Sequence, residues 1–493
     1  MDADLPRRFD TDLRSQSKRS VGWTLLRFLS DQLFSFAVFV ILARILSPAD
    51  IGAFAIIAFT AEAFRILATA GLIQTIARAD RLTPEFLDTI HRGQQAMALV
   101  SALSICLLAQ PIADWMGAPN IAGPLMAMSL VLPLATLGTT HMALRLREFG
   151  HRTTALRSVV SGLLGGGAAI AAALAGWGLW SLVVQRLVAE AAGVVLSRRS
   201  YRWTPGWRFD WAILRANLML NASLIYVQLV FLVTVRVQEM AIGAGIGLAA
   251  VGVYRTAWRV VELIGRGAIQ PFTQVAVQTL ARVRDDRVQL ARAYQWMIAR
   301  AAALSFPALV GFGILAPTAV PFVFGDKWAQ AGELAQLFAF MALPFTLNFF
   351  ASPSLSALGA GRSLIALATV QLVASVVLTL AALPFGLFAV AASYVARAYL
   401  TLPLQIWLLA RASGIGPATT LAAIWPPLVA SSVMGMALFS AHRLLVGRVE
   451  DVSLLAILIG GGGALYAALL LGLSPQWRGM VLNAGQALRK ARI

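Results

Sequence analysis

Long apolar stretches separated by short polar connections recur along all 493 residues of the chain. Many of these stretches hold 18 residues or more, and as helices they are long enough to cross the ~30 Å hydrocarbon core of a bilayer. The pattern therefore predicts an all-α polytopic membrane protein with about 14 transmembrane helices. We expect the spans at roughly 21–45, 51–76, 92–113, 121–143, 157–176, 178–197, 213–235, 249–275, 293–315, 331–352, 364–384, 386–409, 420–441 and 452–473.

Composition and charge agree with this interpretation. The chain is 59% hydrophobic and 13% charged, which is too apolar for a soluble protein of this size. Its net charge of +18 comes from arginines in every second connection, which favours membrane orientation over a nucleic-acid partner. The positive-inside rule then predicts an even number of spans with both termini in the cytoplasm. The cytoplasmic basic groups would include Arg7, Arg8, Arg78, Arg81, Arg145, Arg147, Arg198, Arg199, Arg282, Arg284 and Arg489.

An internal similarity suggests two related halves. The stretch PADIGAFAIIAFTAEAF (48–64) aligns with LAAVGVYRTAWRVVELI (248–264) at an offset of 200 residues. Six expected spans separate the two, so both stretches run in the same direction. We therefore expect two pseudo-symmetric six-helix lobes, related by an axis along the membrane normal, plus two extra C-terminal helices. The expected divisions are a cytoplasmic N-terminal segment (1–20), an N-lobe (21–200), a C-lobe (210–410), two further spans (420–473) and a cytoplasmic basic tail (474–493).

The eighth expected span carries an unusual stripe of ionisable residues. In YRTAWRVVELIGRGAIQ (254–270), Arg255, Arg259, Glu262 and Arg266 fall on one helix face, and Gln270 extends that face toward the cytoplasm. An arginine at the bilayer centre costs at least ~2.5–3.5 kcal/mol. The stripe must therefore line a water-filled cavity or pair with other charges.

Both alternatives have support in the sequence. Ion pairs could join helices, since opposite charges lie three or four residues apart in other spans, as in Arg27 and Asp31, Glu62 and Arg65, Arg186 and Glu190, and Arg236 and Glu239. A hydrated cationic cavity is favoured by the three arginines that face one glutamate on the eighth span. Such a cavity suits an anionic substrate, for example a pyrophosphate or a uronic acid.

These patterns give two sets of candidate site residues. The expected substrate-binding groups are Arg255, Arg259, Arg266, Arg27, Arg65 and Gln270. The expected coupling or charge-balancing groups are Glu62, Glu262, Asp31, Glu190 and Glu239, which either carry H⁺ or Na⁺ or only neutralise arginine. The four histidines lack metal-ligand spacing, and no Walker lysine follows the glycine runs, so we expect no metal, no cofactor and no ATP hydrolysis.

Three motifs in order carry a resemblance to a known family. They are LARILSPADIG (42–52), IGLAAVGVYRTAWRV (246–260) and VFGDKWAQA (323–331). With them, the chain resembles the Wzx-type oligosaccharide flippases of the multidrug/oligosaccharidyl-lipid/polysaccharide exporter superfamily. Many relatives carry an Asp-containing motif where this chain reads Val237 to Gly243, and Glu239 stands one position displaced from it.

The resemblance implies alternating access in the bacterial inner membrane, and we expect the protein to be a monomer. It implies movement of a polyprenyl-pyrophosphate-linked oligosaccharide from the cytoplasmic to the periplasmic leaflet, for O-antigen, capsule or exopolysaccharide assembly. The expected partners are an undecaprenyl-pyrophosphate-linked glycan, membrane lipids and, as a candidate, a polysaccharide polymerase.

Other functions remain open from sequence alone. A multidrug or organic-cation exporter or a lipid II flippase would share the fold, although the arginine surplus disfavours a cation carrier. A membrane glycosyltransferase or polymerase would need carboxylates or histidines in a sizeable periplasmic loop. Here those loops are short, and Asp50, Asp114 and Asp326 are isolated. We therefore expect a transporter and no catalytic residues.

Overall fold

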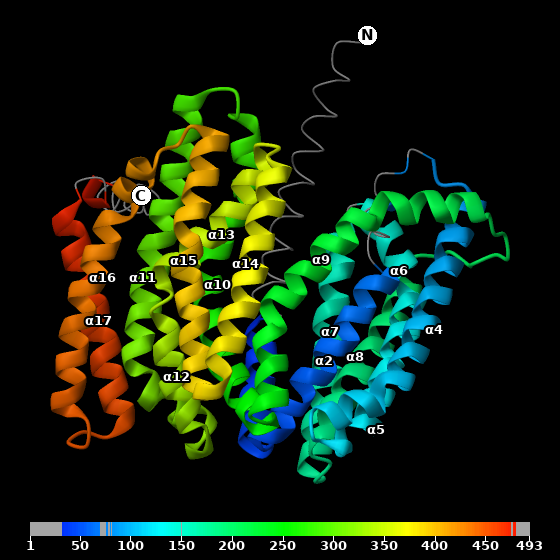
Figure 1. Ribbon diagram of the computed structural model, residues 1–493, viewed down its shortest axis with the longest axis horizontal. Coiled ribbons are helices and arrows are strands. Elements are labelled where there is room, and N and C mark those ends of the chain that lie inside the picture. Colours follow the sequence, from blue (N-terminus) through cyan, green and yellow to red (C-terminus); the bar gives the residue numbers. More distant parts are fainter. Residues whose placement is uncertain are drawn as a thin grey trace, which may run out of the picture. The chain divides into compact units, whose positions relative to one another are not determined.

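The computed structural model describes residues 32–69, 75–76, 79, 81–148, 150–474 and 477–479 (Figure 1). The expected site residues Arg27 and Asp31, the segment 1–20 and the tail from 480 onward lie outside these described residues. The chain forms two compact units, Met1–Gly252 and Val253–Ile493.

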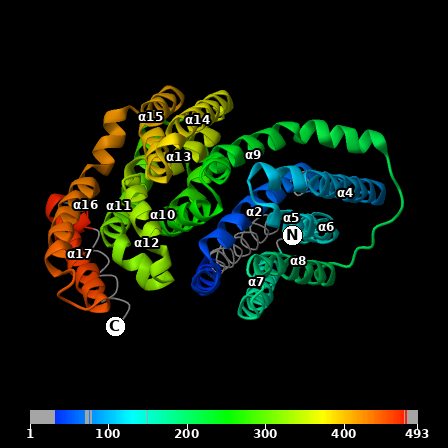
Figure 2. The same cartoon turned by 60° about the horizontal axis from the view of Figure 1, so that its bottom comes forward.

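The first unit is a bundle of long helices. Figures 1 and 2 show α4, α6 and α8 side by side, and α7 packs along α8. Helix α9 packs on α2 and α4 and so belongs to this unit, while the lobe limits drawn from sequence stay a prediction. The labelled helices are α2 (Pro48–Thr69), α4 (Pro84–Trp115), η1 (Pro119–Ile121), α5 (Ala122–Ser129), α6 (Val131–Arg147), α7 (His151–Leu174), α8 (Leu179–Ser200) and α9 (Trp211–Gly245).

The second unit is also helical throughout its described residues. Helix α11 packs against α16, and α17 lies beside both at the C-terminal end of the chain (Figures 1 and 2). The helices are α10 (Leu248–Arg282, whose first turn belongs to the first unit), α11 (Arg287–Phe324), η2 (Asp326–Trp328), α12 (Ala329–Ala339), α13 (Ala342–Ala357), α14 (Gly361–Ala382), η3 (Leu383–Phe385), α15 (Leu387–Ser413), α16 (Pro417–Leu445) and α17 (Asp451–Leu473).

The expected all-α polytopic class is confirmed. Within the described residues, 11 helices are long and apolar enough to cross a membrane. Each of the other three expected spans is helical but takes a different form in the structure. Residues 32–45 of the first span form a shorter apolar helix, the eighth span is the charged helix α10, and the tenth is a pair of helices bent by 65° between Ala339 and Ala342.

Polar caps mark where three long helices begin. Thr83 accepts a hydrogen bond from the Phe86 backbone at the start of α4, and Asp210 accepts one from Ala212 at the start of α9. Asp286 accepts bonds from the backbone of Val288 and Gln289 at the start of α11. These bonds satisfy amides that a helix leaves without partners. They also lower the pKa of the Asp286 carboxyl, with the Gln289 bond contributing most.

The two similar stretches meet at a pair of glycines. A Cβ added to Gly52 would overlap the Leu248 carbonyl, and one added to Gly252 would overlap the Pro48 carbonyl. The offset of 200 residues relates Pro48 to Leu248 as well as Gly52 to Gly252. The contact is therefore reciprocal, as a local two-fold axis requires, and only glycine permits the two backbones to approach so closely.

Replacing either glycine by alanine should destabilise the protein by about 1–3 kcal/mol or more, because the new methyl group meets backbone on the opposing helix. The losses for Gly52→Ala and Gly252→Ala should be similar, as the contact is reciprocal. Thermal unfolding of the purified protein measures this. Gly267→Ala on α10 is the matched control, since open space surrounds Gly267 and alanine favours helix there. A large difference in unfolding temperature between Gly52→Ala and Gly252→Ala would contradict the reciprocity.

Candidate functional site

Helix α2 presents a closely bonded ion pair. Arg65 Nε lies 2.7 Å from Glu62 Oε2, and Arg65 Nη2 lies 2.5 Å from Glu62 Oε1. The guanidinium therefore donates two parallel hydrogen bonds to the carboxylate. Both side chains are about one-third exposed, at 39% for Arg65 and 33% for Glu62. The i,i+3 spacing seen in the sequence therefore produces a bidentate salt bridge on a membrane-spanning helix.

Two further pairs belong to the same unit. On α9, Arg236 Nη1 lies 2.6 Å from Glu239 Oε1, and the Glu239 side chain is only 2% exposed. Between α7 and α8, Arg157 Nη2 lies 3.7 Å from Glu190 Oε1, and Arg157 Nε also donates to the Gly193 carbonyl. Sequence spacing had suggested Arg186 as the partner of Glu190, but the ion pair comes from Arg157 of the neighbouring helix.

These groups act on one another across four helices. Arg186 of α8 and Arg236 of α9 lie close enough to attract the Glu62 carboxylate electrostatically, and Glu190 attracts Arg65 in the same way. The first unit thus gathers four guanidinium groups, Arg65, Arg157, Arg186 and Arg236, around three carboxylates, Glu62, Glu190 and Glu239. The charges of these described residues nearly balance, which fits a network that holds helices together.

The second unit carries the stripe on α10. Arg255, Arg259, Glu262, Arg266 and Gln270 are all half-buried. Glu262 Oε1 lies 2.8 Å from Arg266 Nη2, so one of the three arginines is paired with the only acid of the stripe. The Arg266 guanidinium also lies 5.6 Å from the ring of Phe349 on α13. The sequence expectation that this face lines a hydrated cavity stays a prediction.

Aromatic packing sets the direction in which the stripe faces. Trp258 of α10 makes edge-to-face contacts with Phe338 of α12, Phe345 of α13 and Tyr394 of α15, at ring-centroid distances of 5.0–6.1 Å. Tyr254 contacts Phe338 in the same way. Such contacts are specific in geometry. They hold one face of α10 against three helices, and the stripe occupies the adjacent face, one residue along the helix from Tyr254 and Trp258.

Arg397 on α15 is a membrane-embedded cation that the sequence interpretation missed. Its residue is only 5% exposed, and its guanidinium carbon lies 4.6 Å from the centroid of the Tyr394 ring. Among the described residues, no ion pair to Arg397 is found and its Nε has no hydrogen-bond partner. No acid lies three or four residues away on α15, so intra-helix spacing gave no signal. Arg397 therefore adds positive charge to the second unit.

The connection between α8 and α9 is fastened onto α4. Asp88 accepts a hydrogen bond from the Gly206 backbone, and Arg92 donates twice to the Gly206 carbonyl. The Trp203 ring lies edge-on to the rings of both His91 and His141, at 5.3 Å from each. The histidines therefore pack and bond within a structural contact, which fixes the chain just before α9 begins. This contact joins residues more than 60 positions apart and has no sequence signature.

A family model and two related proteins all concern polysaccharide biosynthesis or transport. A family model described as "Polysaccharide biosynthesis protein" matches residues 41–333. The succinoglycan biosynthesis transport protein ExoT of Rhizobium meliloti (strain 1021) is 27% identical over 357 residues, which are 72% of this chain and 72% of ExoT. The lipopolysaccharide biosynthesis protein WzxC of Escherichia coli (strain K12) is 22% identical over 308 residues, or 62% of each chain.

A solved structure shares the fold. The lipid II flippase MurJ, in an inward closed conformation, aligns with a TM-score of 0.75 and 13% sequence identity, covering 94% of this chain and all of MurJ. At that identity the similarity shows the fold alone. ExoT is named as a transport protein and MurJ as a flippase, so the resemblance is to transporters rather than to enzymes.

Removing the Arg397 charge should stabilise the protein. A buried cation without a carboxylate partner is costly, whereas methionine would keep most of the apolar contacts of the side chain. We expect Arg397→Met to raise the midpoint of thermal unfolding in detergent, and Arg411→Met, at an exposed site near the end of the same helix, to change it little. A lower midpoint for Arg397→Met would mean that its charge is compensated.

Proposed function

The chain belongs to the polysaccharide biosynthesis protein family, and from this premise we propose that it is a flippase for lipid-linked oligosaccharide. It moves a polyprenyl-pyrophosphate-linked glycan from the cytoplasmic to the periplasmic leaflet of a bacterial inner membrane, with both of its own termini in the cytoplasm. The names of ExoT and WzxC, which refer to succinoglycan transport and lipopolysaccharide biosynthesis, support a surface-glycan precursor as the substrate.

The cationic stripe of α10 is the observation that carries the proposal. The stripe on α10 holds three arginines and one acid, so arginine outnumbers acid there, and Glu262 is paired with Arg266. Guanidinium groups recognise phosphate oxygens with two parallel hydrogen bonds. Arg255, Arg259 and Arg266 would therefore bind the pyrophosphate and any acidic sugars, with Gln270 beside them, while the lipid tail remains in the bilayer.

The same arrangement argues against an organic-cation exporter. A cavity selective for cations would present an excess of carboxylates, whereas arginines exceed acids on α10 and Arg397 adds to the excess. A lipid II flippase of the same fold would also carry a pyrophosphate. Genetic complementation distinguishes the two, since loss of a lipid II flippase stops growth.

The proposed transporter needs no covalent catalysis. Its export step draws on H⁺ or Na⁺ entry through Glu62 or Glu262.

Replacing Arg259 by alanine should abolish glycan export, because the headgroup loses a cation from the middle of the stripe. In a strain whose own copy is deleted, we expect at least about a tenfold loss of surface polysaccharide, with lipid-linked precursor accumulating in the membrane. Immunoblotting of the membrane fraction checks that the protein is inserted at its normal level.

Two companion variants sharpen this test. Arg282→Ala removes an exposed arginine from the last turn of the same helix and should leave export intact. Arg259→Lys keeps the charge but not the forked geometry and should export partially. Full export by a stably inserted Arg259→Ala protein would remove this residue from the mechanism.

The role of Glu62 can be separated from simple charge balance. Glu62→Gln leaves Arg65 without its carboxylate and should reduce export under either role. If Glu62 only balances charge, the double variant Glu62→Gln, Arg65→Gln should recover export, because it removes both charges of the pair. We expect no recovery, since coupling needs an ionisable carboxylate. Export driven by imposed H⁺ or Na⁺ gradients in membrane vesicles measures the difference, and recovery would contradict a coupling role.

A further inference from the structure

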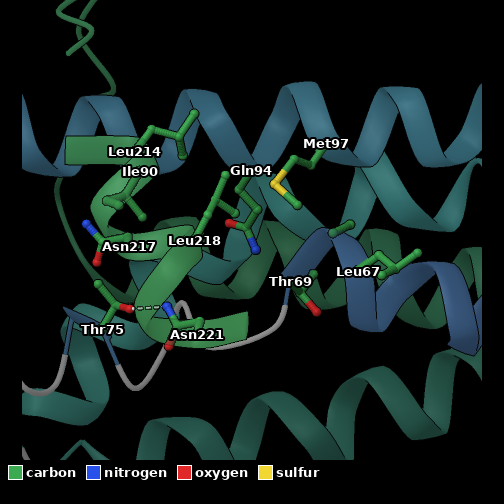
Figure 3. A pocket seen from close by; sticks show the side chains of 11 residues that line it. Leu67, Thr69, Thr75, Ile90, Gln94, Met97, Leu214, Asn217, Leu218 and Asn221 are labelled. Carbon is green, nitrogen blue, oxygen red and sulfur yellow. Dashed lines mark hydrogen bonds between the residues drawn. The ribbon is translucent and has the colours of Figure 1, made fainter. Parts of the chain in front are cut away.

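A pocket lies within the first unit, between α2, α4 and α9. It is partly open, and its empty volume is about 370 Å³, including the space open to solvent at its mouth. Figure 3 shows Gln94 extending from α4 toward Leu218 of α9, with Thr69 and Asn221 on its other sides. The lining residues are Leu67, Ala68, Thr69, Thr75, Ile90, Gln94, Met97, Leu214, Asn217, Leu218 and Asn221. None of them belongs to the charged network around Glu62.

The Gln94 side chain is buried with its hydrogen-bonding capacity unused. The residue is 3% exposed, and neither its Oε1 nor its Nε2 has a partner among the described residues. Two other amides share the pocket and are already engaged. Asn221 Nδ2 donates to Thr75 Oγ1 at 2.8 Å, and Asn217 Nδ2 donates to the Ile213 carbonyl at 2.8 Å. Because buried polar groups in native proteins are almost always satisfied, Gln94 calls for a ligand that supplies both a donor and an acceptor.

The lining defines the chemistry of that ligand. No residue of the lining is ionisable, so nothing in the pocket compensates the charge of a phosphate, a pyrophosphate or a uronate. Three carboxamides and two threonine hydroxyls are too polar for a lipid chain. A carboxamide offers an acceptor and a donor side by side, which matches two adjacent hydroxyl groups of a sugar. Leu67, Met97, Leu214 and Leu218 can cover the C–H face of its ring.

We propose that this pocket binds a neutral hexose residue of the transported glycan, with the Gln94 amide bonded to two vicinal hydroxyls. The inference rests on the proposed function for the identity of the glycan. It adds a second recognition element that differs from the first in charge. The arginines of α10 bind the anionic headgroup, whereas the pocket binds an uncharged sugar residue. Helices α4 and α9 both begin at connections expected to be cytoplasmic, so this sugar binds as the substrate is loaded.

Binding of simple glycosides to the full-length protein in lipid nanodiscs tests the proposal. The probes are methyl β-D-glucopyranoside and methyl β-D-galactopyranoside, followed by saturation-transfer NMR, with inorganic pyrophosphate as the charged comparison. We expect at least one glycoside to bind the wild-type protein, and its affinity to fall about tenfold or more in Gln94→Leu, which removes both hydrogen bonds. The affinity for pyrophosphate should not depend on Gln94.

Two more variants separate recognition from folding. Gln95→Leu changes the adjacent amide, which does not line the pocket, and should bind the glycoside as the wild type does. Leu218→Phe fills the pocket while leaving Gln94 in place and should also abolish binding. Gln94→Leu should unfold at the same temperature as the wild type or higher, because it removes an unsatisfied buried amide.

The outcomes distinguish this inference from the proposed function. Absence of glycoside binding to the wild type, or equal binding to wild type and Gln94→Leu, overturns the pocket's assignment even where the chain restores glycan export. Failure of the wild-type chain to restore export contradicts the flippase proposal, and Gln94-dependent glycoside binding would still support a neutral-sugar site.

Discussion

The cost of placing ionised groups in hydrocarbon governs the interior of this protein. Each arginine or glutamate in a spanning helix must find an opposite charge or water, since the lipid offers neither. The first unit meets this requirement with pairs inside helices, as in Glu62 and Arg65, and between helices, as in Arg157 and Glu190. The Arg157–Glu190 pair therefore joins α7 to α8 by charge neutralisation in addition to apolar packing.

The second unit carries more arginine than acid along α10. Glu262 neutralises Arg266, and the aromatic contacts of Trp258 hold the adjacent face of α10 in place. Arg397 is enclosed beside Tyr394, and no carboxylate in the described part of the chain pairs with it. An excess of arginine over acid on this helix is what the proposed anionic substrate requires. The two units therefore differ in how far their described acids balance their arginines.

Sequence reasoning recovered the features that depend on local periodicity. Apolar length predicted the spans, and i,i+3 or i,i+4 spacing predicted the pairs at Glu62 and Glu239, because both signals repeat along a single helix. It missed what depends on neighbouring helices. Arg157 reaches Glu190 from another helix, and Gln94 becomes distinctive only because α9 closes over it. The break between Ala339 and Ala342 was hidden as well, since both halves are apolar.

The reciprocal approach of Gly52 and Gly252 restricts sequence change at both positions. Each backbone excludes a side chain from the other, so a substitution at one position cannot be relieved by a smaller residue at the other. The internal similarity around these positions thus coincides with the place where sequence change is most restricted.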